Sequence, residues 1–120
     1  MKKNMKRKGQ TKAQLAKAQR RARFKAWAAL SLKLRERAGE CQACGSTERL
    51  QAHHVLHRKQ NPALLLEEND VAVLCARCHC RLHRGREVEF WMWFEEKFPE
   101  KAAWLRRWLK ENGRFVEEAK

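Results

Sequence analysis

The chain has 120 residues, of which 35% are charged, and it carries a formal net charge of +14 at neutral pH. A chain of this length is expected to form one small domain, for which a bound metal is a common source of stability. No apolar stretch approaches the roughly 20 residues that a membrane-spanning helix needs, and the basic N-terminus lacks the apolar segment of an export signal. These features argue against a membrane or secreted protein and favour a cytoplasmic one.

The positive charge is concentrated at the N-terminus. Residues 1–37 contain 14 Lys or Arg and one acidic residue, a balance of +13, whereas residues 38–120 contain 14 basic and 13 acidic residues, a balance of +1. Such a segment is typical of binding to phosphate backbones, anionic lipid or ribosomal RNA. A mitochondrial transit peptide is a weaker alternative, because the segment is Lys-rich and continues directly into a patterned helix.

The first expected element is a long helix at residues 11–38. This stretch has no Gly or Pro, and good helix formers dominate it up to Gly39, where the helix should end. Its apolar residues on or near one face are Leu15, Trp27, Leu30 and Leu34. Two short strands then follow at residues 50–56 and 70–74, separated by a loop.

The remaining expected elements are helices. One covers residues 76–84, and a second covers residues 87–98, where aromatic side chains recur at helical spacing. Pro99 suits the first turn of a last helix, for which Gly113 suits the C-cap. We therefore divide the chain into a basic arm and helix (1–38), a core (39–86) and a helical extension of the same domain (87–120).

Five cysteines are present, and four of them form two Cys-x-x-Cys pairs, Cys41 with Cys44 and Cys75 with Cys78. In a reducing cytosol such pairs indicate metal ligands rather than disulfides. Four thiolates suit the tetrahedral preference of Zn²⁺ and leave no open coordination position, so this ion should be structural. Cys80 falls outside the pattern, and we expect it to pack in the interior, with a spare ligand or a free thiol as the alternative.

All five histidines lie between residues 53 and 83. His79 and His83 are four residues apart and share one helical face, while His53 and His54 are neighbours on a strand and point to opposite faces. One of the pair can therefore bind a metal with His79 and His83 while the other acts on a substrate. Hydrolysis needs this division between a metal that stabilises charge and a base that activates water.

The combined motif resembles the HNH endonucleases. It comprises Cys41-x-x-Cys44, Leu50-Gln-Ala-His53-His54-Val55, and Asn69-Asp70-Val-Ala-Val-Leu-Cys75-x-x-Cys78-His79-x-x-x-His83. The likeness is greatest to the small phage and prophage members with four zinc cysteines, and it covers about residues 41–83. It implies a ββα-metal core, similar to a treble clef, in an α+β and mostly helical chain, and it implies the cytoplasm of a bacterial or phage-infected cell.

The resemblance also implies roles for individual residues. His54 corresponds to the general base, and one catalytic divalent cation (Mg²⁺, Mn²⁺, Ni²⁺ or Zn²⁺) would be held by His53, His79 and His83. The family usually has Asn five residues before the third cysteine, where this chain has Asp70, with Asn69 one position earlier. Asp70 could accept a hydrogen bond from His54 and hold its tautomer.

The sequence therefore predicts an HNH endonuclease that hydrolyses DNA, double-stranded or branched, and leaves 5′-phosphate and 3′-hydroxyl ends, as the resemblance implies. The alternative is a non-catalytic zinc-finger DNA-binding protein with a vestigial site; an RNA-binding, ribosome-associated protein would leave the histidines without a purpose. His57 and Arg58 either touch the scissile phosphate or are plain loop residues. Expected DNA contacts come from Arg58 and from Lys17, Arg20, Arg21, Arg23 and Lys25.

Overall fold

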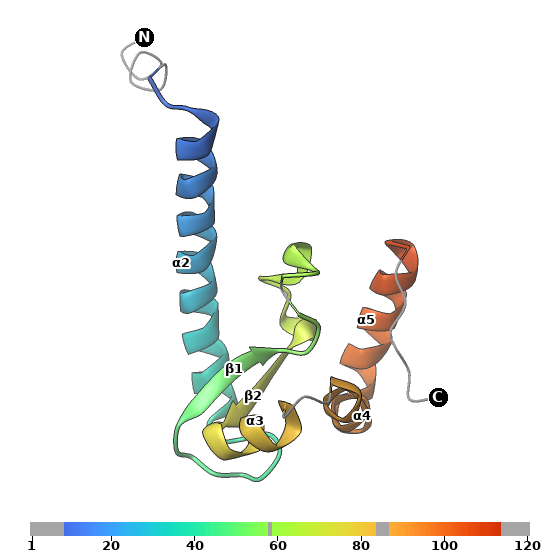
Figure 1. The fold of residues 1–120 in the computed structure, drawn as a ribbon. Coiled ribbons are helices and arrows are strands. Elements are labelled where there is room, and N and C mark those ends of the chain that lie inside the picture. The colour runs from blue at the N-terminus through green and yellow to red at the C-terminus, as the bar shows by residue number, and fades with distance from the viewer. Residues whose placement is uncertain (1–8, 58, 84–86, 114–120) are drawn as a thin grey trace.

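The structure is a computed structural model that describes residues 9–57, 59–83 and 87–113, without the side chains of His83 and Glu87. Its regular elements form a long helix, a two-stranded hairpin and three further helices (Figure 1). In chain order they are α2 (Lys12–Ala38), β1 (Leu50–His54), the 3-10 turns η1 (Pro62–Leu64) and η2 (Glu68–Asp70), β2 (Val71–Cys75), α3 (Ala76–His83), α4 (Glu87–Lys97) and α5 (Pro99–Glu111).

Helix α2 begins and ends at residues suited to those positions. At its start, Thr11 and Gln14 form a capping box, in which each side chain accepts a hydrogen bond from the other residue's backbone amide. At its end, Gly39 adopts a left-handed conformation (φ 70°), and its amide donates to Arg35. Only the C-terminal part of the helix lies beside the strands, and the rest projects away from them (Figure 1). Leu15, near the start of the helix, is accordingly 44% exposed, whereas Leu34 near its end is buried.

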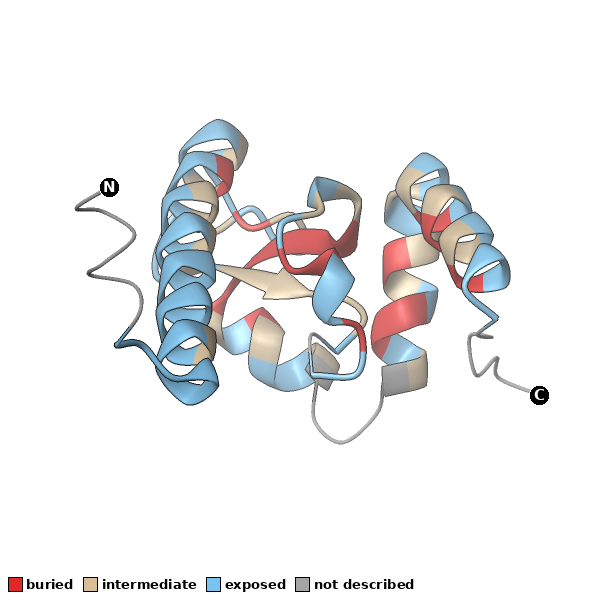
Figure 2. Ribbon diagram, turned by 90° about the horizontal axis from the view of Figure 1, so that it is seen from above, coloured by how far each residue is buried: buried red, intermediate tan, exposed pale blue. Residues whose placement is uncertain are grey.

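Strand β2 is the centre of the fold because both of its faces are covered. Its side chains alternate, so Val71 and Val73 pack with Leu34 of α2, whereas Ala72 and Leu74 join the larger core of α4 and α5. Figure 2 shows buried residues concentrated on β2, α4 and α5, while α2 is exposed along most of its length. The antiparallel register pairs His53 with Ala72 and His54 with Val71.

The other edge of β2 is paired with the turn that carries the first two cysteines. The Gln42 amide donates to the carbonyl oxygen of Val73 at 2.9 Å, and the Gln42 side-chain oxygen accepts the Val73 amide at 2.7 Å. Gly45 has a positive φ of 81°, which lets its amide turn back to the carbonyl oxygen of Cys41. These contacts place the first cysteine pair beside the end of β2.

Helices α4 and α5 form the main core with β2. Phe90, Phe94 and Leu105 are almost completely buried there. Helix α4 ends at Lys97, one residue earlier than expected, because Phe98 precedes a proline and such a residue avoids helical dihedrals. The φ and ψ of Phe98 are −128° and 69°. Gly113 follows the C-cap Asn112 rather than serving as the C-cap itself.

Strand boundaries differ slightly from the prediction. β1 ends at His54 instead of residue 56, because the next two amides bond to the main chain and side chain of Asp70 rather than to a regular partner. β2 correspondingly begins at Val71, one residue late. The fold is thus mostly helical with a small antiparallel sheet, consistent with the expected α+β, ββα-metal architecture. No helix in the described ranges is long and apolar enough to cross a membrane.

Candidate active site and metal centre

The two Cys-x-x-Cys turns meet at one point. Four sulfur atoms, all within 4.8 Å of one another, come from Cys41, Cys44, Cys75 and Cys78. The sulfurs of Cys44 and Cys75 are 3.7 Å apart. In a tetrahedral site with Zn–S bonds of about 2.3 Å, neighbouring sulfurs lie about 3.8 Å apart. The four cysteines are therefore positioned to bind a metal ion and could hold zinc.

Backbone amides point at the sulfur atoms of both turns. Ala43 and Cys44 each donate to Cys41 Sγ at 3.4 Å, and Cys78 donates to Cys75 Sγ at 3.4 Å. Burial opposes ionisation of Cys41, but the backbone donors outweigh it and lower its pKa to about 6. Burial and the neighbouring thiols raise the pKa of Cys78 to about 12. The thiols therefore cannot all ionise together at neutral pH unless a cation reduces their mutual repulsion.

Cys80 is an exposed free thiol on α3, outside this cluster. The expectation that it packs in the interior was therefore wrong. Cys78 and Cys80 are two residues apart, so their side chains project from nearly opposite sides of the helix. Since Cys78 points to the metal site, Cys80 points to solvent.

His53 and His79 lie together on the α3 side of the hairpin. Their rings are stacked, with centroids 3.5 Å apart and planes inclined by 7°. His53 Nε2 is 2.9 Å from the side-chain oxygen of Gln51, which accepts its hydrogen and leaves the lone pair on Nδ1. Burial lowers the pKa of His79 and so favours the neutral imidazole, the form that binds metals. The side chain of His83, the third expected ligand, lies outside the described residues.

His54 projects from the opposite face of the strand, toward α2. Its ring centroid is 4.2 Å from that of Trp27. Its Nε2 lies 2.9 Å from the carbonyl oxygen of Leu65 in the loop between the strands. Because a carbonyl oxygen can only accept, Nε2 carries the hydrogen and Nδ1 keeps its lone pair. The structure thus separates the two adjacent histidines, as predicted, and favours Nδ1 as the basic atom of His54.

Asp70 is fully buried and holds the backbone that follows His54. Its carbonyl oxygen accepts the Val55 amide at 2.8 Å, and its Oδ1 accepts the Leu56 amide at 2.8 Å. Burial raises the pKa of Asp70 to about 8. A protonated carboxyl group has a hydroxyl donor and a carbonyl acceptor on a planar group of the same shape as the Asn amide, with its NH₂ donor and carbonyl acceptor, so neutral Asp70 can replace the usual Asn. Asp70 was a possible acceptor for His54, but its hydrogen bonds go to the loop backbone instead.

Asn69 makes a different set of contacts. Its backbone and side-chain N–H groups both donate to the carboxylate of Glu67, at 3.2 and 2.8 Å. It therefore stabilises the turn at η2, whereas Asp70 reaches the loop beside the histidine pair. This geometry favours Asp70 over Asn69 for the middle position of the motif.

The basic residues of α2 divide between two sides of the helix. Arg20 and Arg23 face the loop between the strands, and the Arg23 guanidinium donates to the carbonyl oxygen of Pro62. Arg58 lies outside the described residues. Three other expected DNA contacts are exposed on the helix: Lys17, Arg21 and Lys25.

Sequence reasoning missed two contacts of His54. Trp27 was expected only as part of an apolar helical stripe, and nothing in its spacing indicates contact with a histidine of β1. The Leu65 carbonyl is a backbone group, which any residue supplies, so it carries no sequence signal. Both contacts require that α2 and the loop lie on the same side of the hairpin.

The four-cysteine cluster thus belongs to the same hairpin and helix that bring His53 and His79 together. The family model described as HNH endonuclease matches residues 41–85, which include both cysteine pairs and all five histidines. That segment therefore supports a nuclease-type, metal-binding function, and an HNH domain implies a nucleic acid substrate. No curated protein and no solved structure matches the chain.

Proposed function

We propose that the protein is an endonuclease that hydrolyses DNA phosphodiester bonds and leaves 5′-phosphate and 3′-hydroxyl ends. The division of the histidine pair carries this proposal. His54 is held through Nε2 on one side of β1, and His53 stacks with His79 on the other. The face proposed to bind the catalytic ion and the basic nitrogen of His54 thus lie on opposite sides of the end of β1.

His54 is the general base in this proposal. Its Nδ1 takes a proton from a water molecule whose oxygen then bonds to phosphorus. The bond from phosphorus to the 3′ oxygen breaks, and that oxygen takes up a proton from solvent to give the 3′-hydroxyl end. The Leu65 carbonyl keeps the basic nitrogen on Nδ1. The tilted contact with the Trp27 ring restrains the His54 ring, so the base is oriented before the substrate arrives.

The catalytic ion would be held by His53, His79 and His83. Imidazole ligands suit several divalent ions, so Mg²⁺, Mn²⁺, Ni²⁺ and Zn²⁺ are all candidates. Such an ion supplies stabilisation of the charge that develops on the phosphate and the departing 3′ oxygen. The four cysteines would hold a separate structural Zn²⁺, a site suited to the reducing cytoplasm.

The test is cleavage of a plasmid and of end-labelled duplex DNA with each of the four ions. His54→Ala should lower the cleavage rate about 10² to 10⁴-fold, the usual contribution of a general base, and leave binding of the catalytic ion unchanged. His79→Ala removes a ligand, so ion affinity and cleavage should fall together. Cys80→Ala, an exposed neighbour of His79, is the matched control and should cut like the parent.

Two results would contradict the proposal. Cleavage by His54→Ala at the parent rate would remove the base from the mechanism. A parent protein that binds zinc and DNA but cuts with none of the four ions would be the non-catalytic DNA-binding protein instead. Sealing of the product nicks by DNA ligase, without prior phosphorylation of the 5′ ends, would confirm the expected 5′-phosphate and 3′-hydroxyl ends.

A further inference from the structure

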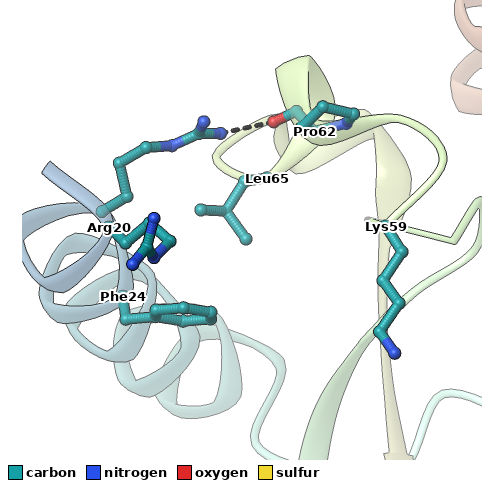
Figure 3. Close-up of a pocket in the computed structure, with 6 residues that line it drawn as sticks. Arg20, Phe24, Lys59, Pro62 and Leu65 are labelled. Carbon is teal, nitrogen blue, oxygen red and sulfur yellow. Dashed lines mark hydrogen bonds between the residues drawn. The ribbon is translucent and has the colours of Figure 1, made fainter. Parts of the chain in front are cut away.

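A groove separates α2 from the loop that follows β1. Its volume is about 330 Å³, and α2 contributes Arg20, Arg23 and Phe24 to one wall (Figure 3). The loop contributes Lys59, Pro62 and Leu65 to the other. Three of these six side chains are cationic and three are apolar, and no carboxylate is among the described lining residues. The groove therefore combines an apolar interior with positive charge, a pattern suited to an anion that carries a flat apolar group.

The α2 wall continues the face that packs against the hairpin. With 3.6 residues per turn, Arg23 lies one turn before Trp27 and Arg20 lies about two turns before it, on the same side of the helix. This face is apolar where it meets β2 and cationic where it passes the loop. Arg21 is about 100° away from Arg20 and does not line the groove. The helix therefore directs only part of its positive charge into the groove.

The groove leads to the histidine that acts as the base. Leu65 lines it, and the carbonyl oxygen of the same residue holds His54 Nε2. The Trp27 ring contacts the His54 ring at a tilted angle, and Trp27 lies one turn from Phe24 on α2. A DNA strand that lies in the groove therefore passes the side of the hairpin from which His54 projects.

We propose that this groove binds an unpaired nucleotide of the DNA strand next to the scissile phosphate. Its phosphate would lie between Arg20, Arg23 and Lys59, and its base would stack on Phe24, whose side chain is 51% exposed. A groove of about 330 Å³ has room for one nucleotide, and a base can stack on Phe24 only when it is unpaired and out of the double helix. The preferred substrate is therefore DNA with a single-stranded stretch at the cut site, which refines the nuclease function proposed above and rests on it.

Binding measurements separate this proposal from the nuclease assignment. The His54→Ala protein, without added divalent ions, is titrated with a fluorescent single-stranded oligonucleotide and with a duplex of the same sequence. Adding Phe24→Ala should weaken single-strand binding about 5- to 150-fold, the range for one lost base stack of 1–3 kcal/mol, and leave duplex binding nearly unchanged. Leu32→Ala is the matched control, because Leu32 is an equally exposed apolar residue of α2 outside the groove.

Charge is tested with a second matched pair. Arg20→Ala and Arg21→Ala each remove one positive charge from neighbouring positions, but only the first should lower the preference for the single strand. Phe24→Leu keeps apolar bulk without an aromatic face and should also lose single-strand affinity, which covers the case in which Phe24→Ala fails to fold. Equal losses for both substrates, or none, would overturn the proposal. If the parent protein cleaves no DNA but still binds the single-stranded oligonucleotide in preference to the duplex, only the nuclease assignment is refuted.

Discussion

Replacing Asp70 by Asn should stabilise the protein by an amount that grows with pH. The Asp70 side chain is fully buried, and its Oδ1 accepts the Leu56 amide while its Oδ2 has no hydrogen-bond partner among the described residues. Burial raises its pKa from 3.8 to about 8. At neutral pH the unfolded chain therefore has an ionised carboxylate that must take up a proton on folding. Asn keeps the acceptor for Leu56 and needs no proton.

The size of the effect follows from the two pKa values. Between pH 3.8 and 8 the folded state binds the proton and the unfolded state does not, so the stability of the parent falls as pH rises, by about 1.4 kcal/mol per pH unit. Over pH 5.5 to 7.5 the gain from Asp70→Asn should grow by about 2.5 kcal/mol. The new amide N–H groups at the Oδ2 position add a constant cost of roughly 1–3 kcal/mol if they stay unpaired. The slope with pH, rather than the absolute value, is therefore diagnostic.

Urea denaturation followed by tryptophan fluorescence measures this slope. Parent and variant are compared at each pH in the same excess of zinc, so that the pH dependence of metal binding cancels in the difference. Glu48→Gln, at an exposed carboxylate, is the control and should give a difference that does not change with pH. An Asp70→Asn gain that is constant from pH 5.5 to 7.5 would refute the protonated state of Asp70. Cleavage by Asp70→Asn should equal or exceed that of the parent, whereas Asn69→Ala should have little effect.

Three further predictions concern the metal site, the basic arm and the contact on His54. The purified protein should contain one zinc ion per chain by elemental analysis. Cys41→Ser or Cys75→Ser should leave the domain largely unfolded, because metal binding contributes on the order of 10 kcal/mol to folding. A folded sample without zinc would contradict this, and Cys80→Ser is the control. Deleting residues 1–25 removes 11 positive charges and should reduce the slope of log affinity against log salt by roughly 0.9 for each lost duplex phosphate contact; an unchanged slope would exclude the arm as a DNA-binding element. Trp27→Ala should lower the cleavage rate at saturating DNA more than it lowers DNA affinity, because the Trp27 ring restrains His54. Trp27→Phe should restore most of the rate. Equal effects on rate and affinity would assign Trp27 a purely structural role.

The local features of this protein are determined by residues close together in the sequence. Gly39 ends α2 because it adopts a left-handed conformation, and Pro99 separates α4 from α5 because the residue before a proline avoids the helix. The spacing within each Cys-x-x-Cys turn lets two sulfurs point to one side, and strand alternation separates His53 from His54. Such properties follow from backbone geometry over a few residues and were predictable without the tertiary structure.

The contacts that complete the candidate site were decided by the tertiary structure. Leu65 and Trp27 reach His54 only because the loop and α2 lie on the same side of the hairpin, at sequence separations of 11 and 27 residues. Asp70, rather than Asn69, holds the loop because its carbonyl oxygen and Oδ1 reach the Val55 and Leu56 amides, whereas Asn69 bonds to Glu67. The groove likewise exists only between two segments far apart in the chain. Sequence periodicity indicates which side of an element is apolar, but the position at which two elements meet depends on the packing of all the others.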